Sequence, residues 1–253
     1  MEPGNTITVP NSLMATNSPS SVPPAGPQSD VVALSAMALR AARAGTGDDE
    51  LDSLASLTPG ELRDGLLGDA EKLAFWINVY NAGIQYLLRR DPGAYGRKWR
   101  FFASAGVTIA GRRLSFNAIE HGMLRRSRFG YSLGYLSNPL PNGFERQFRL
   151  ERPDPRIHFA LNCGAASCPP ISTYFAESID AQLDLAAGSY VESECRYDPG
   201  SNIVTVPRLF FWFHGDFGGR RGTVEFLRRY AQLPPAVQPR VKYGPYDWTL
   251  AMG

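Results

Sequence analysis

Cysteine and histidine are both scarce in this sequence, with three residues of each among 253. Three cysteines are too few for the disulfide framework of a small secreted protein, and their odd number leaves at least one thiol free. Cys163 and Cys168 are close enough for a disulfide in an oxidising compartment, and Cys195 stands apart. The scattered histidines make a four-ligand zinc site a poor alternative.

The chain also lacks a strong excess of charge of either sign and any long apolar run. Its net charge is +2, with 43% hydrophobic and 20% charged residues. This balance argues against nucleic acid as a partner, and no run approaches the length of a membrane span. We therefore expect a globular protein with a small-molecule or peptide substrate, and the composition gives no signal for its oligomeric state.

The sequence lacks several motifs that would indicate a cofactor or a known catalytic class. There is no GxxxxGK[ST] phosphate-binding loop, no GxSxG nucleophile elbow and no pair of histidines at helical HxxxH spacing. We expect neither a cofactor nor a metal ion.

Residues 1–30 are rich in proline, serine, asparagine and glycine, with isolated apolar residues. Such a composition cannot form a core, so we expect a disordered tail followed by one globular domain over residues 31–253. The tail has no basic start followed by an apolar stretch, so no secretory signal is predicted within it, and both cytoplasmic and exported locations fit.

The longest predicted helix covers residues 69–90 and is apolar on nearly every side, which is typical of a buried helix. Trp76 is expected to anchor the core. Asn78, Asn81 and Gln85 nevertheless share one face. Buried amides need partners, so this face either braces neighbouring loops or lines a polar site.

The most informative stretch is DPRIHFALNCGAASCPPI at residues 154–171. Residues 157–161 read as a short buried strand, which Asn162, Cys163 and Gly164 terminate. A rigid strand that ends in a cysteine-bearing loop presents a nucleophile well. The alternative is an inert buried thiol, which is common for free cysteine.

The remaining pattern mixes helices and strands without regular alternation, which favours an α+β fold with a central buried helix packed on a mainly antiparallel sheet. We expect strands at residues 99–103, 107–110 and 113–114, and terminal strands at 241–243 and 246–250. Helices are expected at residues 31–44, 116–126, 173–191, 209–214 and 223–233, with a capped helix start at Thr58. A long loop is expected at residues 127–148 and a hairpin around Asp198-Pro199-Gly200.

Five stretches together resemble the bacterial and plant family called domain of unknown function 547. They are LAFWINVYNAG (residues 73–83), IEHGMLR (119–125), the cysteine stretch (154–171), an aromatic-DFG segment (211–218) and YDWTL (246–250). The resemblance covers about residues 51–250. It implies a fold similar to the papain- and transglutaminase-like cysteine hydrolases. Those enzymes place the nucleophile at the start of the central helix, but helix 69–90 contains no cysteine.

One functional interpretation is a cysteine-dependent hydrolase or acyl transferase that attacks an amide, peptide or thioester. Cys163 is the predicted nucleophile, because a thiolate at a strand end is exposed to substrate. His121 is the predicted base, with Glu120 as its neighbouring carboxylate. His158 is disfavoured, because strand geometry would point it away from Cys163, and His214 is expected to be structural.

We expect Asn78, Asn81, Asn162 and Gly164 to contact the substrate, with backbone N–H groups beside Gly164 stabilising an oxyanion. Cys168 is the second candidate thiol, although the prolines after it indicate a structural turn. The other interpretation is a non-enzymatic module, with a degenerate hydrolase fold, that binds a peptide or a small thiol. Fast alkylation of one cysteine near pH 6–7 would distinguish the enzyme.

Overall fold

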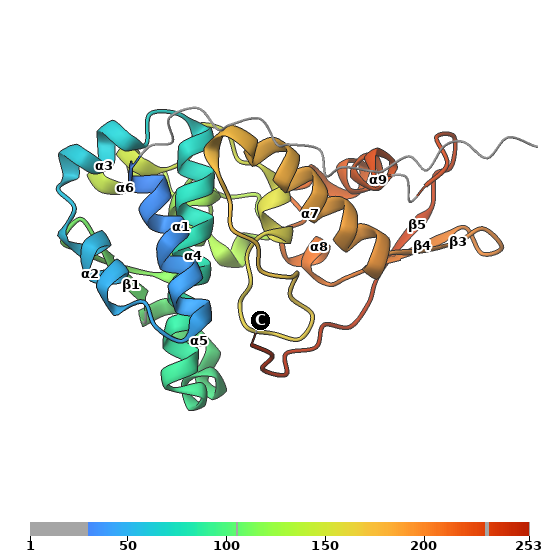
Figure 1. The fold of residues 1–253 in the computed structure, drawn as a ribbon. Helices are drawn as coiled ribbons and strands as arrows, with labels where there is room; N and C mark the ends of the chain where they lie inside the picture. The colour runs from blue at the N-terminus through green and yellow to red at the C-terminus, as the bar shows by residue number, and fades with distance from the viewer. Residues whose placement is uncertain (1–29, 105, 231–232, 253) are drawn as a thin grey trace, which may run out of the picture.

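The computed structural model describes residues 30–104, 106–230 and 233–252 (Figure 1). The tail predicted for residues 1–30 lies outside this part of the chain, apart from Asp30, which begins the first helix. None of the helices in the described residues is long and apolar enough to cross a membrane.

Helix α4 organises the N-terminal half. This half begins with α1 (Asp30–Ala44), α2 (Asp48–Ser56), α3 (Pro59–Gly65) and α4 (Asp69–Arg90), and Figure 1 shows α1 lying along α4. The capped start of α3 is confirmed. Thr58 Oγ1 accepts the N–H of Glu61 at 3.2 Å, and Glu61 Oε2 accepts the N–H of Thr58 at 2.8 Å.

Helix α4 is buried on all sides, as its apolar pattern predicts. Every residue from 72 to 85 is buried. Trp76 is fully buried, and its indole N–H donates to the Phe148 carbonyl at 2.9 Å. Gly83 permits close packing, since a Cβ there would lie 2.7 Å from Val107 and 2.8 Å from Phe116.

The chain between α4 and residue 148 differs from the prediction in two places. It forms η1 (Pro92–Arg97), α5 (Lys98–Ser104), β1 (Gly106–Ile109), β2 (Arg112–Ser115), η2 (Ala118–Leu124), η3 (Gly130–Ser132) and α6 (Gly143–Phe148). The strand predicted at residues 99–103 is wrong. Asp91 caps the turn that leads into α5, and of that helix's residues only Phe101 is buried. The loop predicted at 127–148 contains α6, which Asn142 caps.

The remaining elements are η4 (Pro155–Phe159), η5 (Ala176–Ser178), α7 (Ile179–Glu194), β3 (Arg196–Asp198), β4 (Ile203–Val206), α8 (Leu209–Trp212), α9 (Gly219–Arg229) and β5 (Arg240–Tyr243). The strand predicted at 157–161 is wrong. Asp154 accepts the N–H of Arg156 at 2.9 Å, and Pro155 occupies the first position, so the segment begins as a 3-10 turn.

The α+β class is confirmed, but in place of one mainly antiparallel sheet the described residues form two small sheets. Strands β1 and β2 form one antiparallel pair, whereas β3, β4 and β5 form a separate sheet in which β5 runs parallel to β4. The predicted hairpin joins β3 to β4. Residues 246–250 contribute one isolated bridge, between Leu250 and Ala165, and no strand.

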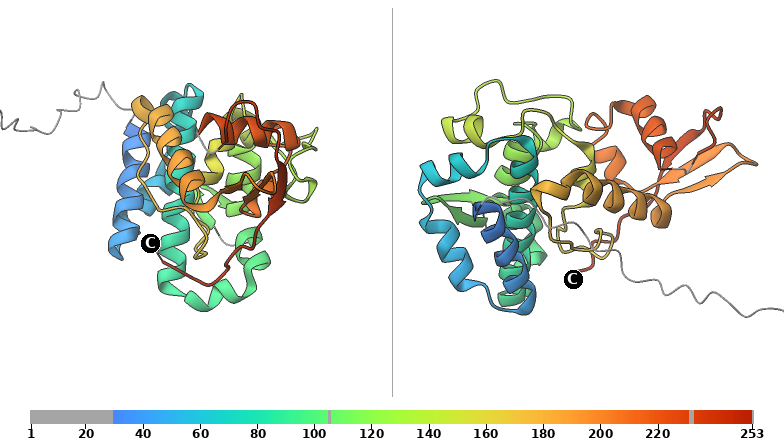
Figure 2. Two further views of the ribbon diagram at one scale, coloured as in Figure 1. Left: turned by 90° about the vertical axis from the view of Figure 1, so that its right-hand side faces the viewer. Right: turned by 45° about the horizontal axis from the view of Figure 1, so that its top comes forward.

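Two hydrophobic clusters meet across α7. Ile179 and Leu183 of this helix belong to the larger cluster around α4, whereas Ala187 and Val191 belong to the cluster around α8 and α9. Figure 2 shows the segment after β5 returning from the second cluster toward α4 and α5. This return brings residues 247–251 against residues 164–167, where backbone hydrogen bonds join the two segments.

Candidate active site

A cavity of about 840 Å³ is lined both by residues of the α4 region, such as Tyr80, and by residues of the α8 region, such as Phe213. Its titratable lining side chains come from six separate segments: Tyr80, Lys98, Glu120, His121, Tyr131, His158, Cys163, Cys168 and Tyr246. Two predicted site residues that are 42 positions apart, His121 and Cys163, therefore share one cavity.

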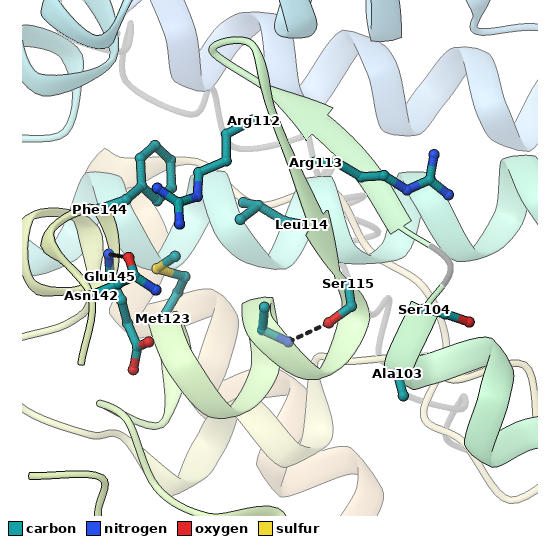
Figure 3. Close-up of a pocket in the computed structure, with 11 residues that line it drawn as sticks. Ala103, Ser104, Arg112, Arg113, Leu114, Ser115, Met123, Asn142, Phe144 and Glu145 are labelled. Carbon is teal, nitrogen blue, oxygen red and sulfur yellow. Dashed lines mark hydrogen bonds between the residues drawn. The ribbon is translucent and has the colours of Figure 1, made fainter. Parts of the chain in front are cut away.

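A second hollow of about 350 Å³ lies over β2, η2 and α6 (Figure 3). Its polar groups serve the local fold. Ser115 Oγ accepts the N–H of Ala118 at 3.1 Å, and Asn142 Oδ1 accepts the N–H of Glu145 at 3.0 Å. Neither cysteine nor histidine lines it, so the larger cavity is the candidate active site.

The two thiols form a close pair in the large cavity. Their Sγ atoms are 2.9 Å apart, and the backbone N–H of Cys163 donates to Cys168 Sγ at 3.1 Å. The Tyr246 hydroxyl lies 3.3 Å from Cys168 Sγ and 3.8 Å from Cys163 Sγ. Cys168 is therefore the better acceptor of hydrogen bonds, because a backbone N–H can only donate.

This asymmetry separates the acidities of the two thiols. The hydrogen bond from Cys163 lowers the pKa of Cys168 to about 7. The same hydrogen bond and burial raise the pKa of Cys163 well above its usual range. The hydrogen bonds therefore favour Cys168 as the more acidic thiol of the pair, whereas the sequence predicted Cys163 as the nucleophile.

Asn162 and Gly164 shape the loop that carries the thiols. Asn162 Oδ1 accepts the N–H of Gly164 at 2.9 Å, and its Nδ2 donates to the Pro169 carbonyl at 2.9 Å. Gly164 has a φ of +87°, and a Cβ there would lie 2.8 Å from Leu88. These contacts assign both residues to the scaffold of the site. The substrate contacts predicted for them remain untested.

The amides of α4 also brace loops. Asn78 Nδ2 donates to the Tyr174 carbonyl at 2.8 Å, and Asn81 Nδ2 donates to the Ala160 carbonyl at 2.9 Å. Asn81 Oδ1 accepts the N–H of Asn162 at 2.9 Å, which ties α4 to the cysteine loop. Both asparagines are fully buried and bonded to backbone groups of neighbouring loops, and the substrate contacts expected of them stay predictions. Gln85 is fully buried and has no hydrogen-bond partner among the described residues.

His121 is held by a guanidinium group. Arg125 Nη1 lies 2.9 Å from His121 Nδ1, while Glu120 Oε1 lies 3.7 Å from the same nitrogen. Arginine can only donate, so Nδ1 is the acceptor and neutral His121 carries its proton on Nε2. Burial also lowers the pKa of His121. Neutral His121 can therefore donate a hydrogen bond from Nε2, and its role as a base stays a prediction.

His158 has the opposite arrangement. Its Nε2 lies 2.8 Å from Asp216 Oδ2, and its ring stacks on Phe213 with 3.8 Å between centroids. Asp216 also accepts two hydrogen bonds from Arg125, at 2.6 and 3.1 Å, and one from Arg128. Burial alone would raise the pKa of Asp216, but the bonds from His158 and Arg125 hold it well below its usual range. His158 therefore donates from Nε2, and its lone pair lies at Nδ1.

Sequence reasoning missed four of these groups. It placed His158 on the far face of a strand, and it assigned no role to Arg125, Asp216 or Tyr246. Asp216 and Tyr246 lie in the aromatic-DFG and YDWTL stretches, whose resemblance to the family was the available signal. Within the described part of the chain, no hydrogen bond links a thiol to a histidine, and no group of three His, Cys, Asp or Glu residues is arranged to hold a metal.

The model of the family described as "Protein of unknown function, DUF547" matches residues 65–191. The chain belongs to this family. The matched region carries α4, both thiols, His121 and His158, whereas Asp216 and Tyr246 lie beyond it. Searches of curated proteins and of solved structures gave no match.

Proposed function

We propose that the protein is a cysteine-dependent hydrolase or acyl transferase that acts on an amide, peptide or thioester carbonyl. One observation carries the proposal. A thiol with several hydrogen-bond donors around its sulfur shares a large cavity with two histidines whose protons are fixed by charged partners.

Cys168 is the proposed nucleophile. The Cys163 backbone N–H, the Cys163 thiol and the Tyr246 hydroxyl surround its sulfur, and these donors stabilise the negative charge of a thiolate. These hydrogen bonds lower the pKa of Cys168 to about 7, which favours its thiolate form near neutral pH. Attack on a carbonyl carbon would join Cys168 Sγ to the acyl group and release an amine, alcohol or thiol.

The two histidines have complementary roles in this proposal. His158 accepts a proton at Nδ1, because Asp216 holds its other nitrogen protonated. His121 donates from Nε2, because Arg125 occupies Nδ1. A base and a donor are what acyl transfer needs for the attacking water and for the developing charge on the substrate oxygen.

The mouth of the cavity favours a substrate with an apolar group beside the carbonyl. Trp99 is 91% exposed, Tyr131 is 80% exposed and Trp248 is 38% exposed, and all three line the cavity. Exposed aromatic side chains of this kind commonly mark a binding surface. An acyl or peptide substrate with an aromatic or aliphatic side chain fits this lining.

A distant relation to papain- and transglutaminase-like hydrolases is part of the proposal. The burial of α4 from residue 72 to residue 85 supports it, but the thiols come from a loop that α4 braces through Asn81.

The test is detection of an acyl-enzyme. The protein is incubated with aryl esters and acyl thioesters that carry aromatic or aliphatic acyl groups, and intact mass is followed with time. We expect an adduct that Cys168→Ala abolishes and that the buried-thiol control Cys195→Ala retains. An adduct that persists in Cys168→Ala would refute the assignment. Saturable binding of these compounds without any adduct or turnover would favour the non-enzymatic binding module.

A further inference from the structure

The spacing of the two sulfurs suits a second chemistry. A disulfide bond is about 2.05 Å long, so the Cys163 and Cys168 sulfurs need to approach by only about 0.9 Å from their separation of 2.9 Å. The third thiol has no such neighbour. Cys195 is 1% exposed and lies in the cluster around α8 and α9.

The loop between the sulfurs is held on both sides, which keeps them opposed. The N–H of Ala166 donates to the Thr249 carbonyl at 2.8 Å, and the N–H of Ala251 donates to the Gly164 carbonyl at 2.8 Å. Within the loop, the N–H of Cys168 donates to the Ala165 carbonyl at 2.9 Å. A partner bound to one sulfur therefore leaves the other within reach.

Both sulfurs are also open to small molecules. Cys163 and Cys168 line the cavity of about 840 Å³, which is large enough for a small organic disulfide. Aromatic side chains line much of this cavity, and its charged lining groups include both Lys98 and Glu120, so a neutral disulfide is a suitable probe.

We propose that Cys163 and Cys168 form a redox-active dithiol that reduces small-molecule disulfides and itself closes to a disulfide. This activity goes beyond acyl transfer and requires no acyl substrate. It also makes the two activities mutually exclusive, since the oxidised pair has no thiolate to attack a carbonyl.

The exchange takes two steps. The Cys168 thiolate, having lost its proton to solvent, attacks one sulfur of the disulfide R–S–S–R. The S–S bond breaks, a mixed disulfide forms on Cys168 and one RS⁻ leaves. Cys163 then loses its proton to solvent and attacks Cys168 Sγ, which releases the second RS⁻. Two electrons pass from the two cysteines to R–S–S–R, and the two protons lost by the cysteines equal the two taken up by RS⁻.

The experiment uses bis(2-hydroxyethyl) disulfide, a small neutral probe, with the full chain. Samples are quenched with iodoacetamide at intervals and weighed intact. Trypsin cannot separate the thiols, because neither lysine nor arginine lies between Arg156 and Arg196. All proteins therefore carry Cys195→Ala, so that a change in intact mass reports only on Cys163 and Cys168. The comparison is between the protein that keeps both of these cysteines, its Cys163→Ser variant and its Cys168→Ser variant.

We expect the protein with both cysteines to lose two hydrogens without a lasting adduct. Cys163→Ser should accumulate the mixed disulfide at a level at least about tenfold higher, because it lacks the resolving thiol. Cys168→Ser should form adduct more slowly. Equal accumulation of adduct with and without Cys163 would overturn the proposal. So would a dithiol that stays reduced under conditions in which the denatured chain oxidises. If Cys163→Ser does not fold, the protein with both cysteines still tests the proposal. A lasting adduct on that protein would contradict the attack of Cys163 on Cys168 Sγ.

Failure of this test leaves the acyl-enzyme test unaffected, because that test is run with the thiols fully reduced. Conversely, a protein that exchanges disulfides but forms no acyl-enzyme refutes the proposed function and keeps the redox inference.

Discussion

Replacing Asp216 by asparagine should cost about 3–5 kcal/mol of unfolding free energy at pH 7.5, the range expected when one partner of a buried ion pair is removed. The Asp216 side chain is 3% exposed and that of Arg125 is 0% exposed. The carboxylate accepts hydrogen bonds from Arg125, Arg128 and His158. An amide has one acceptor oxygen and turns its NH₂ toward these donors, which leaves the buried guanidinium without a countercharge.

The sign of the pH dependence follows from the lowered pKa of Asp216. A carboxyl group whose pKa is lower in the folded than in the unfolded state stabilises the fold above its unfolded pKa, which is near 3.8 here. That contribution disappears only as the pH falls through the folded-state pKa. The full effect of Asp216→Asn is therefore present at pH 7.5.

Urea unfolding at pH 7.5, followed by tryptophan fluorescence, measures this loss. The matched control is Asp64→Asn, since the Asp64 side chain is 75% exposed and pairs at 3.3 Å with Arg63, whose side chain is 61% exposed. We expect the control to change stability by less than about 0.5 kcal/mol. A loss below about 1 kcal/mol for Asp216→Asn would show that the buried charges are compensated elsewhere and that our account of His158 is incorrect.

Three further predictions concern the core, the cavity and the response to pH. Trp76→Ala should lose about 3–5 kcal/mol in the same urea assay, because it empties a fully buried site and orphans a carbonyl, and a loss under about 1 kcal/mol would contradict the central position of α4. Gly130→Ala should slow acyl-enzyme formation, because its Cβ would lie 2.6 Å from His121 Nε2. The control is Gly96→Ala, where a Cβ meets no atom within 4 Å, and equal rates for the two variants would refute a role of His121 in this step. Burial lowers the pKa of His121 and of His158, so the folded state binds fewer protons than the unfolded state in this pH range. The unfolding free energy should therefore decrease as the pH is lowered from 7.5 to 5, and an increase would contradict the argument.

The elements that the sequence predicted well are those set by local signals. Helix α4 has the predicted bounds, and α3 begins at the predicted cap. The turn around Pro199 joins β3 to β4 as expected. Apolar periodicity, a capping box and a turn motif all act over a few residues, so they can be recognised without knowledge of distant partners.

Residues 157–161 show where local reasoning failed. An apolar run of five residues is compatible with a strand or with a buried turn, and periodicity cannot separate the two. The hydrogen bond from the Arg156 N–H to Asp154 Oδ1 stabilises the turn at the start of this segment. The strand assumption had placed His158 away from the cysteines, whereas the turn brings it into the cavity that they line.

The charges that define the site were beyond local reasoning for a different reason. Asp216 is 91 positions from Arg125 and 58 from His158, and no sequence periodicity links them. Nor does the matched family region, which ends at residue 191, contain Asp216 or Tyr246.

Those two residues set the protonation of the groups inside the matched region. Asp216 fixes the proton of His158 on Nε2, and the Tyr246 hydroxyl lies 3.3 Å from Cys168 Sγ. A fragment that ended with the matched region would keep both thiols and both histidines but lose the carboxylate and the hydroxyl that prepare them. The acidity of the thiols is therefore a property of the longer chain, so reactivity must be measured on a protein that includes the segment from Asp216 to Tyr246.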